Sequence, residues 1–323
     1  KGLALAGYTL SNLARPLLGL AGSWVTVLLL RSVDRIGKGL RSAPRDAMVA
    51  DATPSHMRGF AFGFHRALDN AGAVAGGLTA AAILAWSDLS LSEVIMWSAV
   101  PGFVAVLLLG AGVKVEPNSI ESAPKPARTL PPLRWSALSL PMQHYLWVLM
   151  LFTFARASET FILLLGHQLG IGVVELLLLW SGLNLAKALT STQGGQLADR
   201  FGHGSLILIG WLSLALAFLA VSQVTHSSEL WLVSIGYGLL IGMSEGAERA
   251  LISDYAHVNE RGTAFGWYHL VSGIAAIPAG LLFGIVWHYF GAATAFLLAG
   301  LLAIAATLLL RLWAWPKQRP NNP

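Results

Sequence analysis

The sequence predicts an all-α protein that crosses a membrane many times, and three observations point to this class. Hydrophobic residues make up 55% of the 323 positions and charged residues only 11%, whereas soluble domains usually carry about 25% charged residues. Apolar runs long enough to cross the hydrocarbon core of a bilayer recur along most of the chain. Lys and Arg are confined to alternate loops, as expected of a polytopic membrane protein.

The apolar runs predict ten membrane-spanning helices. They cover residues 3–21, 24–49, 60–86, 92–112, 143–166, 172–196, 204–223, 229–253, 262–288 and 291–315. Arg58, Arg200 and Arg261 lie in one set of connecting loops, and the other set contains no Lys or Arg. Because positive residues favour the cytoplasmic side, the first set of loops and the C-terminus are expected in the cytoplasm.

The longest polar connector divides the chain into two bundles. Residues 113–142 are rich in Pro and charged residues, which predicts a flexible cytoplasmic linker. It separates an N-terminal bundle at 1–112 from a second bundle at 143–315, and a cytoplasmic tail follows at 316–323.

A row of charged residues follows the second apolar run. Its members recur mostly at steps of three and four residues, which places them on one side of a helix: Arg31, Asp34, Arg35, Lys38, Arg41 and Arg45. A charge deep in the membrane avoids lipid, so we expect this side to face a partner helix or a water-filled cavity. The alternative is a basic helix end among the lipid headgroups, which suits residues 38–45 better than residues 31–35.

An internal repeat relates the two bundles. The segment 58–64 (RGFAFGF) matches 261–267 (RGTAFGW) at an offset of 203 residues, and 45–51 aligns with 248–254 at the same offset. Both copies face the same side of the membrane, so the repeat is parallel and its axis lies along the membrane normal.

The repeat also predicts two pseudo-symmetric six-helix bundles, of which the first has lost its first two helices. The second bundle begins near residue 143, so its counterpart would begin at 143 − 203, about 60 residues before Lys1. We therefore expect a twelve-helix protein shortened at its N-terminus. A natural ten-helix protein is the alternative.

The segment 195–202 (GQLADRFG) resembles the cytoplasmic loop signature of the major facilitator superfamily, G-x-L-A-D-R-x-G-R-R/K. The usual basic pair is absent after Gly202. At this position Gly195 allows close helix approach, Asp199 can face a helix N-terminus or an arginine, and Arg200 can anchor at anionic headgroups.

Two further segments resemble motifs of the same family. Arg31 resembles the buried arginine of the fourth-helix motif R-x-x-q-G, although the glycines that follow it come late. Residues 72–77 (GAVAGG) resemble the fifth-helix antiporter motif g-x-x-x-G-P, with Gly77 in place of the proline. A small-residue face that serves helix packing alone is the alternative.

This resemblance implies the fold and several partners. The nearest pattern is that of poorly characterised prokaryotic members, which implies the cytoplasmic (inner) membrane. We expect contact with the lipid bilayer, a small-molecule substrate and protons, and we expect a monomer. No cofactor, metal site or nucleic-acid partner is expected, and the absence of Cys excludes disulfides and thiol nucleophiles.

Polar side chains within the apolar segments are the candidates for a substrate or proton pathway. Glu159 is expected to exchange a proton as Arg156 changes partner, with a static ion pair as the alternative. Asn184 and Lys187 are candidate substrate contacts, and His269 either titrates near neutrality or is a hydrogen-bonded core residue. The full set is Arg31, Asp34, Arg35, Arg66, Asp69, Arg156, Glu159, Asn184, Lys187 and His269.

Charges of opposite order mark the two copies of the repeat. Arg45-Asp46 in the first copy aligns with Glu248-Arg249 in the second, and Glu245 adds another acid. We hypothesise that these residues form ion pairs between the bundles that close a cytoplasmic gate. Local solvation of two helix ends is the alternative.

These observations favour a secondary active transporter that works by alternating access, with proton-coupled efflux of a drug or an organic anion by antiport. The cationic excess among the charges placed in helices favours an anionic or zwitterionic substrate. A uniporter, an uptake symporter or a non-transporting sensor remains an alternative. The chain lacks a G-x-x-x-x-G-K-[ST] loop and the H-E-x-x-H and G-x-S-x-G motifs, so neither an ATPase nor a membrane enzyme is supported.

Overall fold

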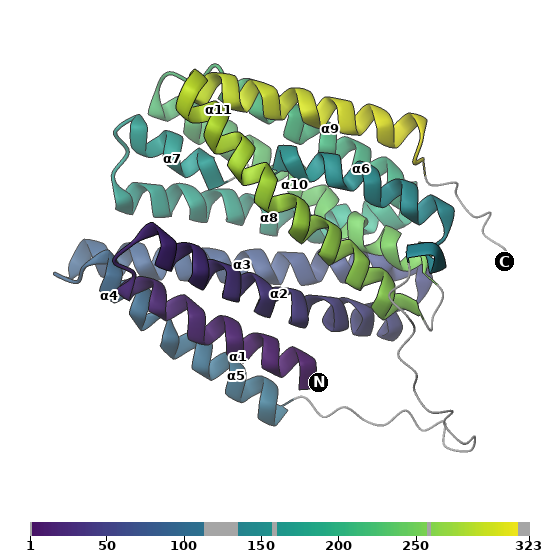
Figure 1. Cartoon of the computed structure of the whole chain (residues 1–323), viewed down its shortest axis with the longest axis horizontal. Helices are drawn as coiled ribbons and strands as arrows, with labels where there is room; N and C mark the ends of the chain where they lie inside the picture. Colours follow the sequence, from purple (N-terminus) through teal and green to yellow (C-terminus); the bar gives the residue numbers. More distant parts are fainter. Residues whose placement is uncertain (1, 113–134, 157–159, 257–259, 316–323) are drawn as a thin grey trace.

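The computed structural model describes residues 2–112, 135–156, 160–256 and 260–315, and all regular structure in these ranges is helical. Figure 1 shows long, roughly aligned helices in two groups. We call α1 to α5 the first bundle and α6 to α11 the second bundle.

The first bundle contains five α-helices and two short 3₁₀ helices. They are α1 (Gly2–Leu17), η1 (Leu18–Leu20), α2 (Trp24–Ala52), η2 (Ser55–Met57), α3 (Arg58–Trp86), α4 (Leu91–Trp97) and α5 (Ala99–Gly112). Side chains cap two of these helices. The Ser23 hydroxyl accepts a hydrogen bond from the Thr26 backbone N–H at the start of α2, and Ser90 forms a capping box with Glu93 at the start of α4.

The second bundle contains η3 (Trp135–Ala137), α6 (Leu140–Arg156), α7 (Phe161–Gln168), α8 (Val173–Phe201), α9 (His203–Val221), α10 (Ser227–Tyr255) and α11 (Arg261–Leu312). Two glycines in the left-handed region mark sharp changes of direction. Gly202 has a φ of 91° at the joint between α8 and α9, and Gly291 has a φ of 85° where α11 is broken.

Within the described residues, seven stretches are long and apolar enough to cross a membrane. They are Ser55–Trp86, Leu91–Ala111, Leu140–Gln168, Val173–Phe201, His203–Val221, Ser227–Tyr255 and Arg261–Leu312. The last stretch has 52 residues and includes the break at Gly291, which agrees with the separate helices expected at 262–288 and 291–315. Helix α1 has only 16 residues and α2 carries the row of charges, so neither is among the seven. The count of ten therefore stays a prediction.

The apolar core lies mainly in the second bundle. Its largest fully buried side chains include Trp211 and Phe152, whose rings stack with centroids 3.9 Å apart. Tyr145 and Phe296 are also fully buried in this bundle. By contrast, many apolar side chains of the first bundle are exposed on the outside of the described structure, as befits helices that face lipid.

The two bundles meet most closely where α3 packs against α8 and α10. A Cβ atom at Gly195 would collide with the carbonyl oxygen of Gly59, and one at Gly63 would collide with that of Ser191. Gly246 of α10 is equally tight, since its Cβ would lie 2.7 Å from the backbone nitrogen of Gly63. Small residues therefore let backbones from opposite bundles come into contact. This region lies at the end of the molecule where α3 and α11 begin, which we call the linker end.

Candidate functional site

A carboxylate of the second bundle caps a helix of the first. The Asp199 side chain accepts hydrogen bonds from the backbone N–H groups of Gly59 and Phe60, at 2.7 Å and 2.8 Å. These N–H groups belong to the first turn of α3, where the helix offers unpaired donors and a partial positive charge. His203 lies beside this cap, with Nε2 3.2 Å from Asp199 and Nδ1 2.6 Å from Asp254.

Two ion pairs related by the repeat connect the bundles at the linker end. Arg58 Nη1 lies 3.5 Å from Asp254 Oδ1, and Arg261 Nη1 lies 2.7 Å from Asp51 Oδ1. The offset of 203 residues converts each pair into the other, since 58 + 203 = 261 and 51 + 203 = 254. Arg261 also donates to the carbonyl oxygen of Ala50 at 3.1 Å. The repeat thus supplies both partners of a symmetric pair of contacts between the bundles.

Deeper in the structure, Asp46 of α2 has a side chain with no exposed surface. Its carboxylate lies 3.2 Å from Arg249 Nε on α10 and 3.0 Å from His269 Nε2 on α11. Arg45, its neighbour in sequence, lies 3.1 Å away. Three basic side chains therefore surround one buried carboxylate, and two of them come from the opposite bundle.

Glu245 of α10 makes the other deep contact between the bundles. Its carboxylate accepts hydrogen bonds from Arg66 Nε and Asn70 Nδ2 on α3, both at 3.1 Å. On the opposite side Lys187 Nζ of α8 lies 3.8 Å from Oε1. Asp69, one turn after Arg66, lies 3.2 Å from the same guanidinium group.

In the part of the chain that the structure describes, all partners of Glu248 belong to its own bundle. Arg156 Nη1 lies 3.0 Å from each carboxylate oxygen, and Trp211 Nε1 and Tyr268 Oη donate at 3.0 Å and 2.9 Å. The structure does not bring Arg45 to Glu248. Among the residues expected to form the gate, Asp46 pairs with Arg249 across the bundles. Glu245 also pairs across them, with Arg66, which was expected in the substrate pathway.

The row of charges along α2 is divided between two surroundings. Asp34 is buried and lies 2.9 Å from Arg15 of α1, while the guanidinium group of Arg41 lies 4.3 Å from the ring centroid of Tyr8. These residues face α1 rather than a central cavity. Arg45 is half-buried beside Asp46. The other members of the row are exposed: Arg31, Arg35 and Lys38.

Other expected site residues lie apart from these contacts. Asn184 donates to the Trp180 carbonyl oxygen of its own helix at 2.7 Å. The guanidinium carbon of Arg200 lies over the ring of Phe201, 5.3 Å from the ring centroid. Glu159 lies outside the described residues.

Sequence reasoning missed several members of these networks, namely Arg15, Asp51, Arg58, His203, Trp211, Asp254, Arg261 and Tyr268. A signal for four of them was present in the repeat. Arg58 and Asp51 each have a counterpart of identical type 203 residues later, and both copies end at the same side of the membrane.

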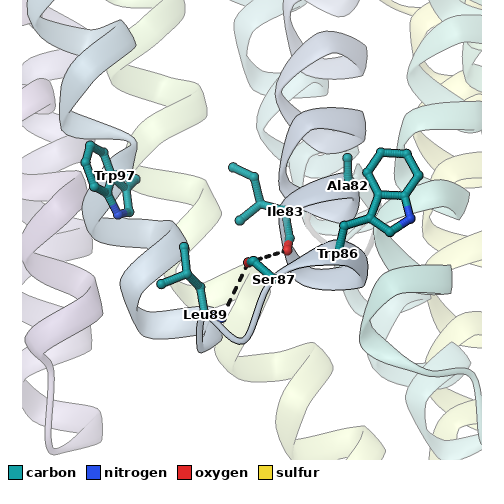
Figure 2. Close-up of a pocket in the computed structure, with 6 residues that line it drawn as sticks. All are labelled: Ala82, Ile83, Trp86, Ser87, Leu89 and Trp97. Atoms are coloured by element: carbon teal, nitrogen blue, oxygen red, sulfur yellow. Dashed lines mark hydrogen bonds between the residues drawn. The ribbon is translucent and has the colours of Figure 1, made fainter.

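The described residues contain no cluster of three or more His, Asp or Glu side chains that could hold a metal ion. A groove of about 340 Å³ lies at the far end of α3, opposite the linker end, and Figure 2 shows its lining. The lining residues are Ala82, Ile83, Trp86, Ser87, Leu89 and Trp97. The Ser87 hydroxyl donates to the Ile83 carbonyl oxygen at 2.6 Å, so the groove presents an almost entirely apolar surface.

Two helical bundles that are related by a sequence repeat and joined by ion pairs have the architecture expected of a membrane transporter. The comparisons with known proteins agree. The model of the Major Facilitator Superfamily matches residues 1–182 and again residues 146–323, so the chain belongs to this family. It is therefore a transporter rather than an enzyme.

Two prokaryotic proteins resemble the chain in sequence over most of its length. An uncharacterised MFS-type transporter of Methanocaldococcus jannaschii is 29% identical over 312 residues, which cover 94% of this chain and 76% of that protein. An uncharacterised protein of Mycobacterium tuberculosis is 30% identical over 299 residues, covering 88% and 69%.

Two solved structures share the fold. The human organic anion transporter MFSD10 matches with a TM-score of 0.74 and 16% identity, over 95% of this chain and 76% of that one. The proton:xylose symporter XylE matches with a TM-score of 0.69 and 15% identity, over 96% and 78%. At this level of identity the likeness concerns the fold alone.

Proposed function

We propose that this protein is a secondary active transporter that exports a small solute by alternating access, in exchange for protons. The observation that carries this proposal is the set of buried ion pairs that join the two bundles through Asp46 and Glu245. Ion pairs between moving bodies can break and reform without loss of the bundles' own cores, as a rocking mechanism requires.

The linker end is proposed to be the cytoplasmic side of the inner membrane. The Lys and Arg residues of the loops favour this orientation, since they gather in the set that includes Arg58, Arg200 and Arg261. In this orientation the contacts of Asp46, Glu245 and Arg249 close a cytoplasmic gate. Arg45 supports the gate from the first bundle through its contact with Asp46. Glu248 supports it from the second bundle by holding Arg156.

Proton coupling is proposed to act on Asp46. Its carboxylate is buried, and its attraction for Arg249 and His269 depends on its negative charge. Protonation of Asp46 would remove one charge from a contact that joins the bundles, which weakens the closed gate. Glu159 and Arg156 form a second proposed proton site, and Arg156 contacts Glu248 at 3.0 Å.

The test is a transport assay on the protein produced from its whole gene, in proteoliposomes that contain a pH-sensitive dye. Drugs, organic anions and sugars are screened for proton movement driven by each solute. We expect proton movement that is lost in Asp46→Asn and retained in Asp88→Asn, a control acid that is exposed at the opposite end. The Glu159→Gln variant is measured beside them.

Each outcome decides one part of the proposal. Proton movement that survives in Asp46→Asn would reject Asp46 as the coupling site, and loss in Glu159→Gln alone would assign the role to Glu159. Solute uptake without any proton movement would reject antiport and favour a uniporter. Absence of uptake for every class of solute would favour a sensor that retains the fold.

A further inference from the structure

We infer that the cationic cluster between α2, α3, α8 and α10 binds an anionic group of the transported solute, and that Lys38 is the side chain that anchors it. This inference rests on the proposed transport function and specifies its substrate class. The anionic group is a carboxylate, sulfonate or phosphate, because a lysine ammonium is a compact point charge that binds all three.

Positive charge is in excess around Lys38. The guanidinium groups of Arg35, Arg41, Arg66 and Arg249 lie near enough to Lys38 to repel its ammonium group, and Arg41 also stacks on Tyr8 of α1. Apart from Arg41, six cations belong to this region, and four of them contact its three acids. The cations are Arg35, Lys38, Arg45, Arg66, Lys187 and Arg249, and the acids are Asp46, Asp69 and Glu245. The described residues therefore leave an excess of three positive charges (6 − 3).

The three acids of this region already have cationic partners. Glu245 lies beside Arg66 and Lys187, and Asp46 lies beside Arg249 as well as Arg45. Asp69 lies 3.2 Å from Arg66. Each carboxylate thus contacts two or more basic groups, since Asp69 also lies 3.9 Å from Arg45.

Two cations of the region, Arg35 and Lys38, remain without an acidic partner among the described residues. Among the residues that the structure describes, neither Arg35 nor Lys38 has a carboxylate within 4.0 Å or a hydrogen-bond partner. Both side chains are exposed, so a solute can reach them. Uncompensated charges within a membrane-spanning bundle are costly and mark functional positions. An anionic solute supplies the missing counter-charge.

The position of Lys38 links this site to the proposed gate. Lys38 precedes Asp46 by eight residues on α2, a distance of about 12 Å along the helix axis. Its neighbours Arg66 and Arg249 are the same guanidinium groups that hold Glu245 and Asp46. An anion at Lys38 therefore competes with Glu245 and Asp46 for these arginines, which weakens contacts between the bundles when the solute is bound.

The inference is tested by binding rather than by transport. The protein from its whole gene is purified in a neutral detergent, and its thermal unfolding midpoint is measured with benzoate, benzenesulfonate and phenyl phosphate. Benzamide serves as the neutral control compound and benzamidine as the cationic one. We expect at least one anion to raise the midpoint in a saturable way, with no comparable effect of the neutral and cationic compounds.

Substitutions assign the effect to Lys38. In Lys38→Met we expect the anion concentration for half-maximal effect to rise about tenfold or more, because a hydrogen bond to a charged group is lost. Lys38→Arg should retain binding. Arg311→Gln is the matched control, since this exposed cation lies near the end of α11, far along the chain from the cluster.

Unliganded Lys38→Met should be at least as stable as the wild type, because the substitution removes one of several mutually repelling charges. A lower midpoint would show that Lys38 has a structural role and would contradict the inference. So would an unchanged anion effect in Lys38→Met, an equal effect of benzamidine, or no effect of any of the three anions.

Anion binding through Lys38 without proton movement would uphold this site and reject the proposed coupling. Proton movement without anion binding would do the reverse.

Discussion

The two copies of the repeat share a backbone plan but place their inner charges differently. In the first copy Asp46 reaches across to Arg249 and His269 of the second bundle. In the second copy Glu248 stays within its bundle, where it binds Arg156, Trp211 and Tyr268. The contacts of Asp46 join the two bundles, whereas the contacts of Glu248 stabilise the second bundle from within, as an internal brace.

The outer positions of the repeat behave in the opposite way. Arg58 with Asp254 and Arg261 with Asp51 are related by the repeat offset, and both pairs cross between the bundles. The inner contact joins the equivalent positions 46 and 249, which carry opposite charges (46 + 203 = 249), whereas the outer charges form two copies of one pair. A repeat can therefore keep the same contact in both copies at its outer positions while its inner positions make different contacts.

The largest expected effect comes from removing the internal brace. Glu248→Gln leaves the guanidinium group of Arg156 without its carboxylate partner, which should cost about 3–5 kcal/mol of stability, as for other broken buried ion pairs. We expect a strongly lowered thermal midpoint in detergent. Glu175→Gln removes an exposed acid in the first turn of α8 and serves as the control. A midpoint within a degree or two of the wild type would show that Glu248 is not a brace.

A charge swap between the bundles should have an intermediate effect. Asp46→Arg and Arg249→Asp each place like charges together, and we expect each to cost about 2–3 kcal/mol. The double variant restores opposite charges at the same contact and should recover much of the midpoint and of transport. Arg45→Glu combined with Glu248→Arg should show no such recovery, because these two side chains do not meet. Equal recovery in both swaps would contradict this distinction.

Removal of the helix cap should have a smaller effect. Asp199→Asn weakens two hydrogen bonds to the backbone N–H groups of Gly59 and Phe60 and removes a negative charge from the start of α3. We expect a loss of about 1–2 kcal/mol, the range found for helix N-caps. Hydrogen exchange at the first turn of α3 should rise, and Asp88→Asn should leave it unchanged. A rise spread evenly over α3 would argue against a local cap.

The smallest effects are expected at the symmetric outer pairs. Arg58→Gln and Arg261→Gln remove ion pairs whose acids are partly exposed, with side-chain exposures of 37% for Asp254 and 52% for Asp51. Each should cost about 1 kcal/mol or less. Arg261→Gln should be the larger loss, since Arg261 also binds the Ala50 carbonyl oxygen. Thermal midpoints at low and high salt would separate the charge effect, and a larger loss in Arg58→Gln would reverse the expected order.

The sequence by itself determined the class of protein and the outline of most helices. Long apolar runs and confined Lys and Arg residues depend only on the chemistry of the bilayer, which acts on each segment separately. The helix expected at 24–49 is α2 at Trp24–Ala52, and that expected at 60–86 is α3 at Arg58–Trp86. The repeat and the loop signature at Asp199 led to the family.

The tertiary structure alone decided which charges become partners. Neighbouring residues on a helix point about 100° apart, so Arg45 and Asp46 face different surroundings although they adjoin in sequence. The same rotation turns Glu248 inward to Arg156 while Arg249 faces the first bundle. How each helix is rotated about its axis depends on close packing, as at Gly59 against Gly195. This packing joins residues more than 130 positions apart, so no local pattern records it.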